Sequence, residues 1–134
     1  MNSSSVVQVT PNVTVQTNPL LFIDTPGPNA TLSQPFLLAG WAIDLASSHN
    51  TGVSTVHVWA YPVGGGPARF VNAVTYGGDR QDVAAAFGGS QYRFSGYGLT
   101  INSLPAGNWD LALLPFSTLN GYFFPATVRR VTVQ

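Results

Sequence analysis

A row of ring-bearing side chains is the feature of the sequence best suited to chemistry. In segment 53–61 (VSTVHVWAY), every second residue points to the same side of an extended strand. One side of that strand then carries Thr55, His57, Trp59 and Tyr61, spaced roughly 6.5–7 Å apart, while the other side is apolar. A flat indole or phenol ring matches the axial C–H face of a pyranose, and burying one such ring contributes on the order of 1–3 kcal/mol. The row could therefore bind a linear sugar polymer.

The same row also has a purely structural interpretation. Aromatic residues are favoured in strands, and they often pack across neighbouring strands on an exposed face. The N-terminal linker or the loop around Phe123 and Phe124 could cover the row as a second layer. The two interpretations differ in whether Trp59 and Tyr61 are exposed to solvent, and both are kept as alternatives.

Segment 108–116 is expected to lie beside segment 53–61. In an immunoglobulin-type sandwich the two corresponding strands are neighbours in the three-stranded sheet. Alternation then turns Trp109 inward, and we expect it in the core at a corner of the sandwich. The outward side of the same strand carries Asn108 and Asp110.

These outward polar residues would suit a hydroxyl-rich ligand. Asp110 would share the outer face with Trp59, and either Arg129 or Arg130 would lie there too. Carboxylate and guanidinium groups form strong hydrogen bonds with neutral hydroxyls. His57 is interpreted as a further hydrogen-bonding partner or as a plain surface residue. The alternative for the Asp–Arg pair is an exposed ion pair that contributes little to stability.

Trp41 lies in the apolar run 36–43 (FLLAGWAI), which predicts a central strand. Both faces of this run are apolar, so alternation does not decide whether Trp41 points inward or outward. In the outward orientation, Trp41 is a further candidate for stacking on a sugar ring.

Turn-forming residues divide the chain into short elements, since 14 Gly and 10 Pro are spread along it. We expect strands over 20–24, 36–43, 53–61, 69–76, 92–101, 108–116 and 127–133, and one helical segment over 79–87 with Asp79 as its N-cap. The pattern predicts an all-β fold, an immunoglobulin-like antiparallel β-sandwich with one short helical turn. We expect residues 20–134 to form this domain and residues 1–19 to be a linker or an edge strand, at Val6–Val9 or Val13–Val15.

Charge is scarce in this sequence and it is balanced. Only 7% of residues are charged, with five Arg, five Asp, no Lys and no Glu, and the formal net charge is zero. The chain therefore lacks the basic footprint of a nucleic-acid or anionic-membrane binder. No stretch approaches the ~20 apolar residues of a membrane span. We expect neither nucleic acid nor membrane as a partner, and the absence of cysteine excludes disulfides and thiolate sites.

Patterns of catalytic residues are missing from the sequence. Acid–base glycoside hydrolysis needs two carboxylates across a bond, and the one close pair, Asp79 and Asp82, is explained by capping and solvation. The sequence has no G-x-S-x-G, P-loop or H-E-x-x-H motif, and His49 and His57 lack metal-ligand spacing. We predict no catalytic residue, no cofactor and no metal. A single structural Ca²⁺ held by Asp side chains and carbonyls is the alternative left open.

Four short motifs carry a family resemblance: 40–44 (GWAID), 56–62 (VHVWAYP), 76–84 (YGGDRQDVA) and 95–97 (SGY). Over about residues 20–133 the chain resembles a bacterial extracellular Ig-like module. It is also similar to the carbohydrate-binding module appended to a metagenome-derived endoglucanase, which binds β-glucans such as cellulose and xyloglucan.

The resemblance implies a non-catalytic β-glucan-binding module, monomeric and secreted, that targets a tethered glycoside hydrolase domain to polysaccharide. Polysaccharides and cello-oligosaccharides would be its ligands. Similar units also serve as spacers, so the alternative function is a structural spacer or adhesion domain of a secreted bacterial surface protein. The alternation argument gives the expected ligand-binding residues: Trp59, Tyr61, His57, Trp41, Asp110, Asn108, Arg129 and Arg130.

Overall fold

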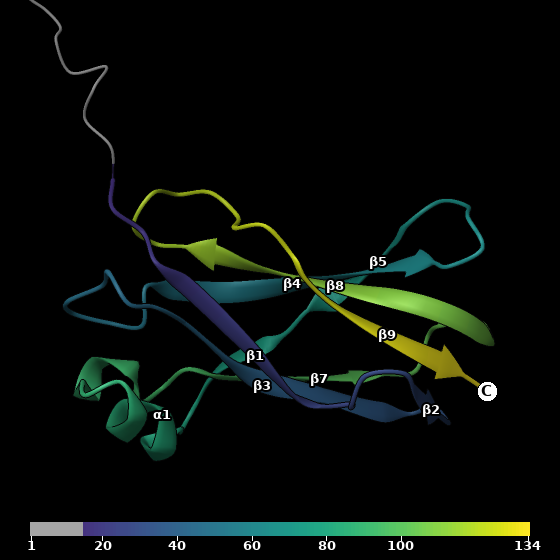
Figure 1. The fold of residues 1–134 in the computed structure, drawn as a ribbon, viewed down its shortest axis with the longest axis horizontal. Helices are drawn as coiled ribbons and strands as arrows, with labels where there is room; N and C mark the ends of the chain where they lie inside the picture. Colours follow the sequence, from purple (N-terminus) through teal and green to yellow (C-terminus); the bar gives the residue numbers. More distant parts are fainter. Residues whose placement is uncertain (1–14) are drawn as a thin grey trace, which may run out of the picture.

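Two β-sheets packed face to face make up the domain in the computed structural model, which describes residues 15–134 (Figure 1). The four-stranded sheet has the order β1 (Pro19–Thr25), β3 (Phe36–Asp44), β7 (Gly96–Ile101) and β6 (Thr75–Gly78). The five-stranded sheet has the order β2 (Ala30–Leu32), β9 (Thr127–Val133), β8 (Gly107–Ser117), β4 (Val53–Pro62) and β5 (Arg69–Ala73). All neighbours are antiparallel except β2 and β9. The all-β sandwich is confirmed, and the two sheets expose opposite outer faces.

Alternate side chains of the strands fill the space between the two sheets. The inward residues of β4 that were expected in the core, Val56, Val58 and Ala60, are fully buried. Val58 and Ala60 are paired with the equally buried Leu113 and Leu111 of β8, the strand hydrogen-bonded beside β4. The predicted pairing of segments 53–61 and 108–116 is therefore confirmed. Trp109 is also in the core, at 6% exposure, and its indole N–H donates to the Pro105 carbonyl over 2.9 Å.

One expected strand, 69–76, is two strands in different sheets. β5 belongs to the five-stranded sheet and β6 to the four-stranded sheet. The chain crosses between them at buried Val74, whose N–H donates to the Val56 carbonyl over 3.0 Å. Apolar residues continue through this segment, at 70, 71, 73, 74 and 76, and it contains no Gly or Pro, so the sequence does not mark the crossing. The three-residue strand β2 was also not predicted.

The helical segment differs from the expectation at its start. Helix α1 spans Gln81–Ala86 and has Arg80, not Asp79, at its N-cap, with no side-chain capping bond. The carboxylate of Asp79 instead forms a two-bond pair with the guanidinium of Arg93, at 2.8 and 2.9 Å. The prediction that Asp79 caps the helix is wrong, because a bidentate guanidinium competes better for the carboxylate than single backbone N–H groups do.

The expected strand 92–101 begins later than predicted, at Gly96. A short 3-10 helix, η2 (Ser90–Tyr92), occupies the preceding residues. Tyr92 is buried, and its hydroxyl donates to the carbonyls of Leu45 and Ser47, both at 3.1 Å. This anchor holds the chain in a turn and delays the start of the strand.

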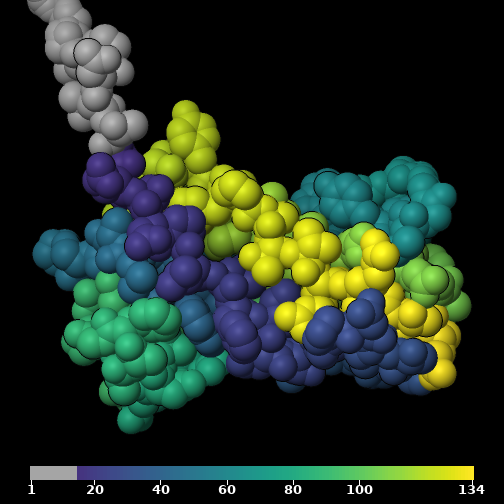
Figure 2. Space-filling view, in the orientation of Figure 1, coloured from purple at the N-terminus to yellow at the C-terminus, as the bar shows by residue number. Residues whose placement is uncertain are grey.

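Helices α1 and η2 form a lobe at one end of the sandwich, the green segment at the lower left in Figure 2. A small second core lies beneath the lobe and contains Ile43, Val83 and Tyr92. In residues 15–134 no helix is long and apolar enough to cross a membrane. The described chain enters at one end of the sandwich and its C-terminus lies at the other (Figure 1).

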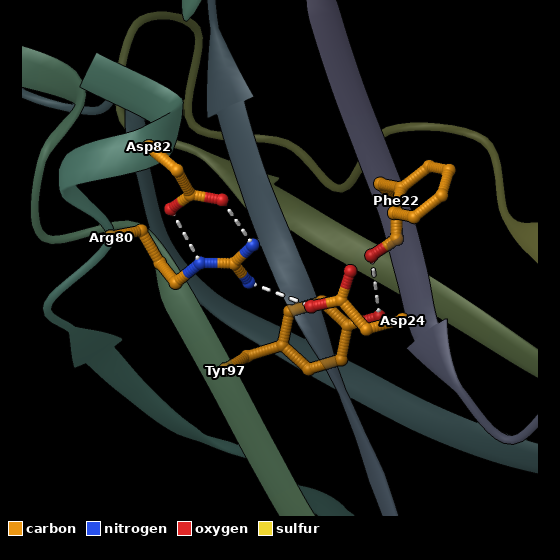
Figure 3. Close-up of polar contacts among 5 residues, drawn as sticks. All are labelled: Phe22, Asp24, Arg80, Asp82 and Tyr97. Carbon is orange, nitrogen blue, oxygen red and sulfur yellow. Dashed lines mark hydrogen bonds and ion pairs between the residues drawn. The ribbon is translucent and has the colours of Figure 1, made fainter. Parts of the chain in front are cut away.

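Arg80 links this lobe to β1, the edge strand of the four-stranded sheet (Figure 3). Its Nε and Nη2 donate to the two carboxylate oxygens of Asp82 over 2.9 and 2.8 Å. Its Nη1 donates to Asp24 Oδ2 on β1 over 2.7 Å. The bonds from Arg80 lower the pKa of Asp82 from 3.8 to about 2.

This lowered pKa predicts a specific loss of stability in acid. A carboxyl that is more acidic when folded stabilises the protein above its unfolded pKa, and that contribution is lost as the pH falls from 3.8 to about 2. Asp82→Asn should therefore flatten the decline of the unfolding free energy over this interval, measured by urea denaturation at successive pH values. An unchanged decline in the variant would show that Arg80 does not hold Asp82 in solution.

Candidate functional site

A strip of rings lies on the outer face of the five-stranded sheet. It consists of six side chains, five from three neighbouring strands and one from the loop after β8. They are His57, Trp59 and Tyr61 of β4, Phe70 of β5, Phe116 of β8 and Phe123 of the loop. We call this set the aromatic strip. The residues of β4 in the strip alternate with fully buried ones, so they point away from the core as predicted.

Contacts between rings hold the aromatic strip together. The centroid of the Phe70 ring lies 5.3 Å from those of both His57 and Trp59, with interplanar angles of 65°. The Phe123 ring lies 4.6 Å from that of His57 and 5.0 Å from that of Phe116. These tilted contacts are in the range preferred by aromatic pairs. They fix the orientation of Trp59 and His57 before any ligand arrives.

The solvent exposure of the strip distinguishes the two interpretations of the sequence, a binding surface or a packed layer. Tyr61, Phe70 and Phe123 are 49%, 47% and 41% exposed, while His57 and Trp59 are half-buried. Part of the surface of every ring except that of Tyr61 is in contact with a neighbouring ring of the same strip. The rest forms an open apolar surface, and the loop around Phe123 covers only the His57 end.

Three rings of the strip, Phe70, Phe116 and Phe123, were not among the expected site residues. Phe70 reaches the strip because the β4–β5 hairpin pairs it with Trp59. The Gly-rich turn at 64–66 between two predicted strands indicates a hairpin, and this is the sequence signal that could have revealed it. Phe123 is placed by its neighbour Phe124, which is buried and donates its N–H to the Pro115 carbonyl over 2.8 Å.

A polar margin borders the Tyr61 end of the strip. Asp110, paired with Tyr61 across β4 and β8, accepts two bonds of 2.8 Å from Arg130 on β9. Arg130 thereby lowers the pKa of Asp110. Beside this pair, the Asn108 side-chain oxygen accepts a 2.7 Å bond from the Thr132 hydroxyl. The structure therefore brings Asn108, Asp110 and Arg130 together with the strip.

Arg129 lies on the opposite side of β9 from Arg130. It is paired across the sheet with inward-facing Leu111, and its Nη1 donates to the Pro26 carbonyl over 3.0 Å. Because side chains alternate along a strand, only one of two adjacent arginines can share a face with the aromatic strip. That residue is Arg130, and the inclusion of Arg129 in the expected site is not supported.

Trp41 belongs to the outer face of the other sheet and is remote from the strip. Leu38 and Ala42 of β3 are fully buried, which fixes the register that the sequence left open. The Trp41 ring stacks on Phe22 at 6.0 Å and is half covered by Phe87 of the helical lobe at 5.4 Å. The two expected stacking sites are thus on opposite faces of the domain.

Within residues 15–134, no three His, Asp, Cys or Glu side chains gather into a possible metal site. A scan of the chain against protein-family models gives no match, and a search of curated proteins finds no similar sequence. The functional argument therefore depends on the geometry of this surface.

If the aromatic strip is a surface and not a covered layer, truncating its exposed end should barely change stability. We expect Tyr61→Ala to change the free energy of unfolding by less than about 1 kcal/mol, since its ring is half exposed. Leu111→Ala, at a fully buried position, should cost about 2–5 kcal/mol. Urea denaturation of both variants makes the comparison. Similar losses for the two would mean that Tyr61 is a packing residue.

Proposed function

We propose that this chain is a non-catalytic carbohydrate-binding module that binds neutral β-glucans, such as cellulose, xyloglucan and cello-oligosaccharides, on the aromatic strip. The observation that carries the proposal is the open row of Tyr61, Trp59 and Phe70 on one sheet face, with Tyr61 and Phe70 about half exposed. In this proposal a chain of pyranose rings lies along the row and covers its apolar ring surface, with the rings of Trp59 and Phe70 tilted by 65° to each other.

Preorganisation of the rings supports the same proposal. Trp59 is held by Phe70, and His57 is held between Phe70 and Phe123. Side chains that are already fixed lose little conformational entropy when a ligand binds. The strip therefore offers apolar contact at a low ordering cost.

The polar margin supplies hydrogen-bonding groups for sugar hydroxyls. The pair of Asp110 and Arg130 presents carboxylate acceptors and guanidinium donors beside Tyr61, and Asn108 adds an amide. A hydroxyl both donates and accepts, so it matches such a mixed margin. Because the two charges neutralise each other, the margin favours a neutral ligand over an ionic one.

The proposed function does not include catalysis, and the charge state of the carboxylates supports this. Asp79, Asp82 and Asp110 all have their pKa lowered by arginine partners, which keeps these carboxylates ionised at neutral pH. A general acid for glycoside hydrolysis requires a raised pKa instead. In this role the module is secreted and increases the local concentration of a tethered catalytic domain on polysaccharide.

The second candidate function is a structural spacer or adhesion domain of a secreted surface protein. The ring-to-ring contacts of the strip favour it, since they bury part of Trp59 and His57 without any ligand. A spacer would require no affinity for glucans.

Affinity electrophoresis in gels containing xyloglucan or hydroxyethylcellulose distinguishes the two. Phe70→Ala and Tyr61→Ala should each weaken retardation roughly 5- to 150-fold, equivalent to about 1–3 kcal/mol of lost ring contact. Phe94→Ala is the matched control, because Phe94 is 54% exposed but lies outside the strip, beside η2. Unretarded migration of the native protein in every gel would favour the spacer. Equal retardation of the Phe70 and Phe94 variants would remove the strip from the site.

A further inference from the structure

The outer face of the four-stranded sheet has a hollow of about 370 Å³ beside Arg80. Its floor is mostly backbone, because it is formed by Ala39, Gly40, Gly96 and Gly98 from the two central strands. This volume is within the roughly 300–1,000 Å³ range of small-ligand sites. The hollow lies on the opposite side of the sandwich from the aromatic strip.

Two of these floor glycines are explained by packing. A Cβ at Gly40 would clash with the backbone carbonyl oxygen of Phe22. A Cβ at Gly96 would come within 3.2 Å of both Arg80 Cγ and the Gly78 carbonyl oxygen. These glycines let the side chain of Arg80 and the neighbouring strands approach closely.

Gly98 has no such explanation. A Cβ there would meet only Leu37 Cδ1, at the ordinary contact distance of 3.9 Å, and its backbone is not left-handed. Glycine weakens the interior of a strand and often marks a place where a ligand approaches the backbone. The missing side chain at Gly98 keeps the floor of the hollow open.

The wall of the hollow carries a fixed donor and a fixed acceptor (Figure 3). Arg80 is held by Asp24 and Asp82, as described above, and each Nη nitrogen retains a second hydrogen. Asp24 Oδ2 accepts from Arg80, and Asp24 Oδ1 has no hydrogen-bond donor within residues 15–134. An adjacent donor and acceptor of this kind match a sugar hydroxyl, which needs both.

We propose that the hollow is a second sugar-binding subsite that takes one neutral hexose ring. The C–H face of the ring lies on the floor at Gly98 and Ala39, and its hydroxyls bond to Asp24 Oδ1 and to Arg80. The lining of the hollow carries two carboxylates, Asp24 and Asp79, and one guanidinium, Arg80, which disfavours an acidic sugar. This inference rests on the proposed glycan-binding function but uses a separate face, so the domain binds two glycan chains at once.

Amide chemical shifts in a titration with cellohexaose test the subsite. We expect shifts at two separate places, around Tyr61 and around Gly98, and a stoichiometry of two ligands per chain. Gly98→Val should fill the hollow, remove the shifts at Ala39 and Gly96, and reduce the stoichiometry to one. Its melting temperature should be no lower than that of the native protein, because valine is favoured in strands. A tri-galacturonate should leave the Gly98 region unshifted.

Two further variants keep the test decisive. Thr100→Val, on the same strand and outer face but outside the hollow, should retain both sets of shifts. Asp24→Asn keeps the shape of the side chain and should weaken binding at the hollow even if Gly98→Val fails to fold.

The outcomes separate this inference from the proposed function. Shifts at the aromatic strip alone would overturn the subsite and leave the proposed function intact. Shifts at the hollow alone would support the subsite and remove the strip as the site. No shift at either place would overturn both. Concentration-dependent shifts at Gly98 without sugar would show that a second copy of the chain occupies the hollow, which also overturns the subsite.

Discussion

The antiparallel register between β4 and β8 is the constraint on which the remaining structure depends. It sets Trp59 opposite Ala112 and Tyr61 opposite Asp110, and it turns Val56 and Val58 into the core. Side chains alternate with a period of two, so a slip of one residue would bury the rings and expose the valines. The free energy of burying those valines therefore also fixes which face carries the rings. The pairing of β4 with β8 therefore determines both the packing of the core and the position of the rings on the surface.

Charge plays a local role in this fold. Four of the five Asp carboxylates are in ion pairs with three of the five arginines. Of the other two arginines, Arg129 donates to a backbone carbonyl and Arg69 is exposed. The remaining carboxylate, Asp44, is buried and accepts two backbone N–H bonds. Within the described residues, every charged side chain except Arg69 thus has a structural partner close by. The faces of both sheets present rings, hydroxyls, amides and neutralised pairs. Such a surface discriminates by shape and by hydrogen bonding, with little attraction for a polyelectrolyte.

Alternation was sufficient to predict the faces of β4 and β8, because one side of each strand is continuously apolar. It could not orient Trp41, since both sides of β3 are apolar, and it could not choose between Arg129 and Arg130 until the register of β9 was known. Phe70 and Phe123 joined the strip through a hairpin and a loop anchor, which are contacts between distant segments. The crossing at Val74 could not be seen in the sequence, because apolar residues continue through it with no Gly or Pro. Local patterns identified the faces of the strands, while tertiary contacts decided which faces meet.

The opposite positions of the chain ends give the sandwich a mechanical property. The described chain enters β1 at one end of the domain and leaves β9 at the other (Figure 1). A pull between Asn18 and Gln134 therefore acts along the strands, and it strains the β1–β3 and β8–β9 hydrogen-bond ladders in shear. In shear, several bonds must break together, whereas a pull across the strands would open them one at a time. The domain is thus built to resist tension applied through its own backbone.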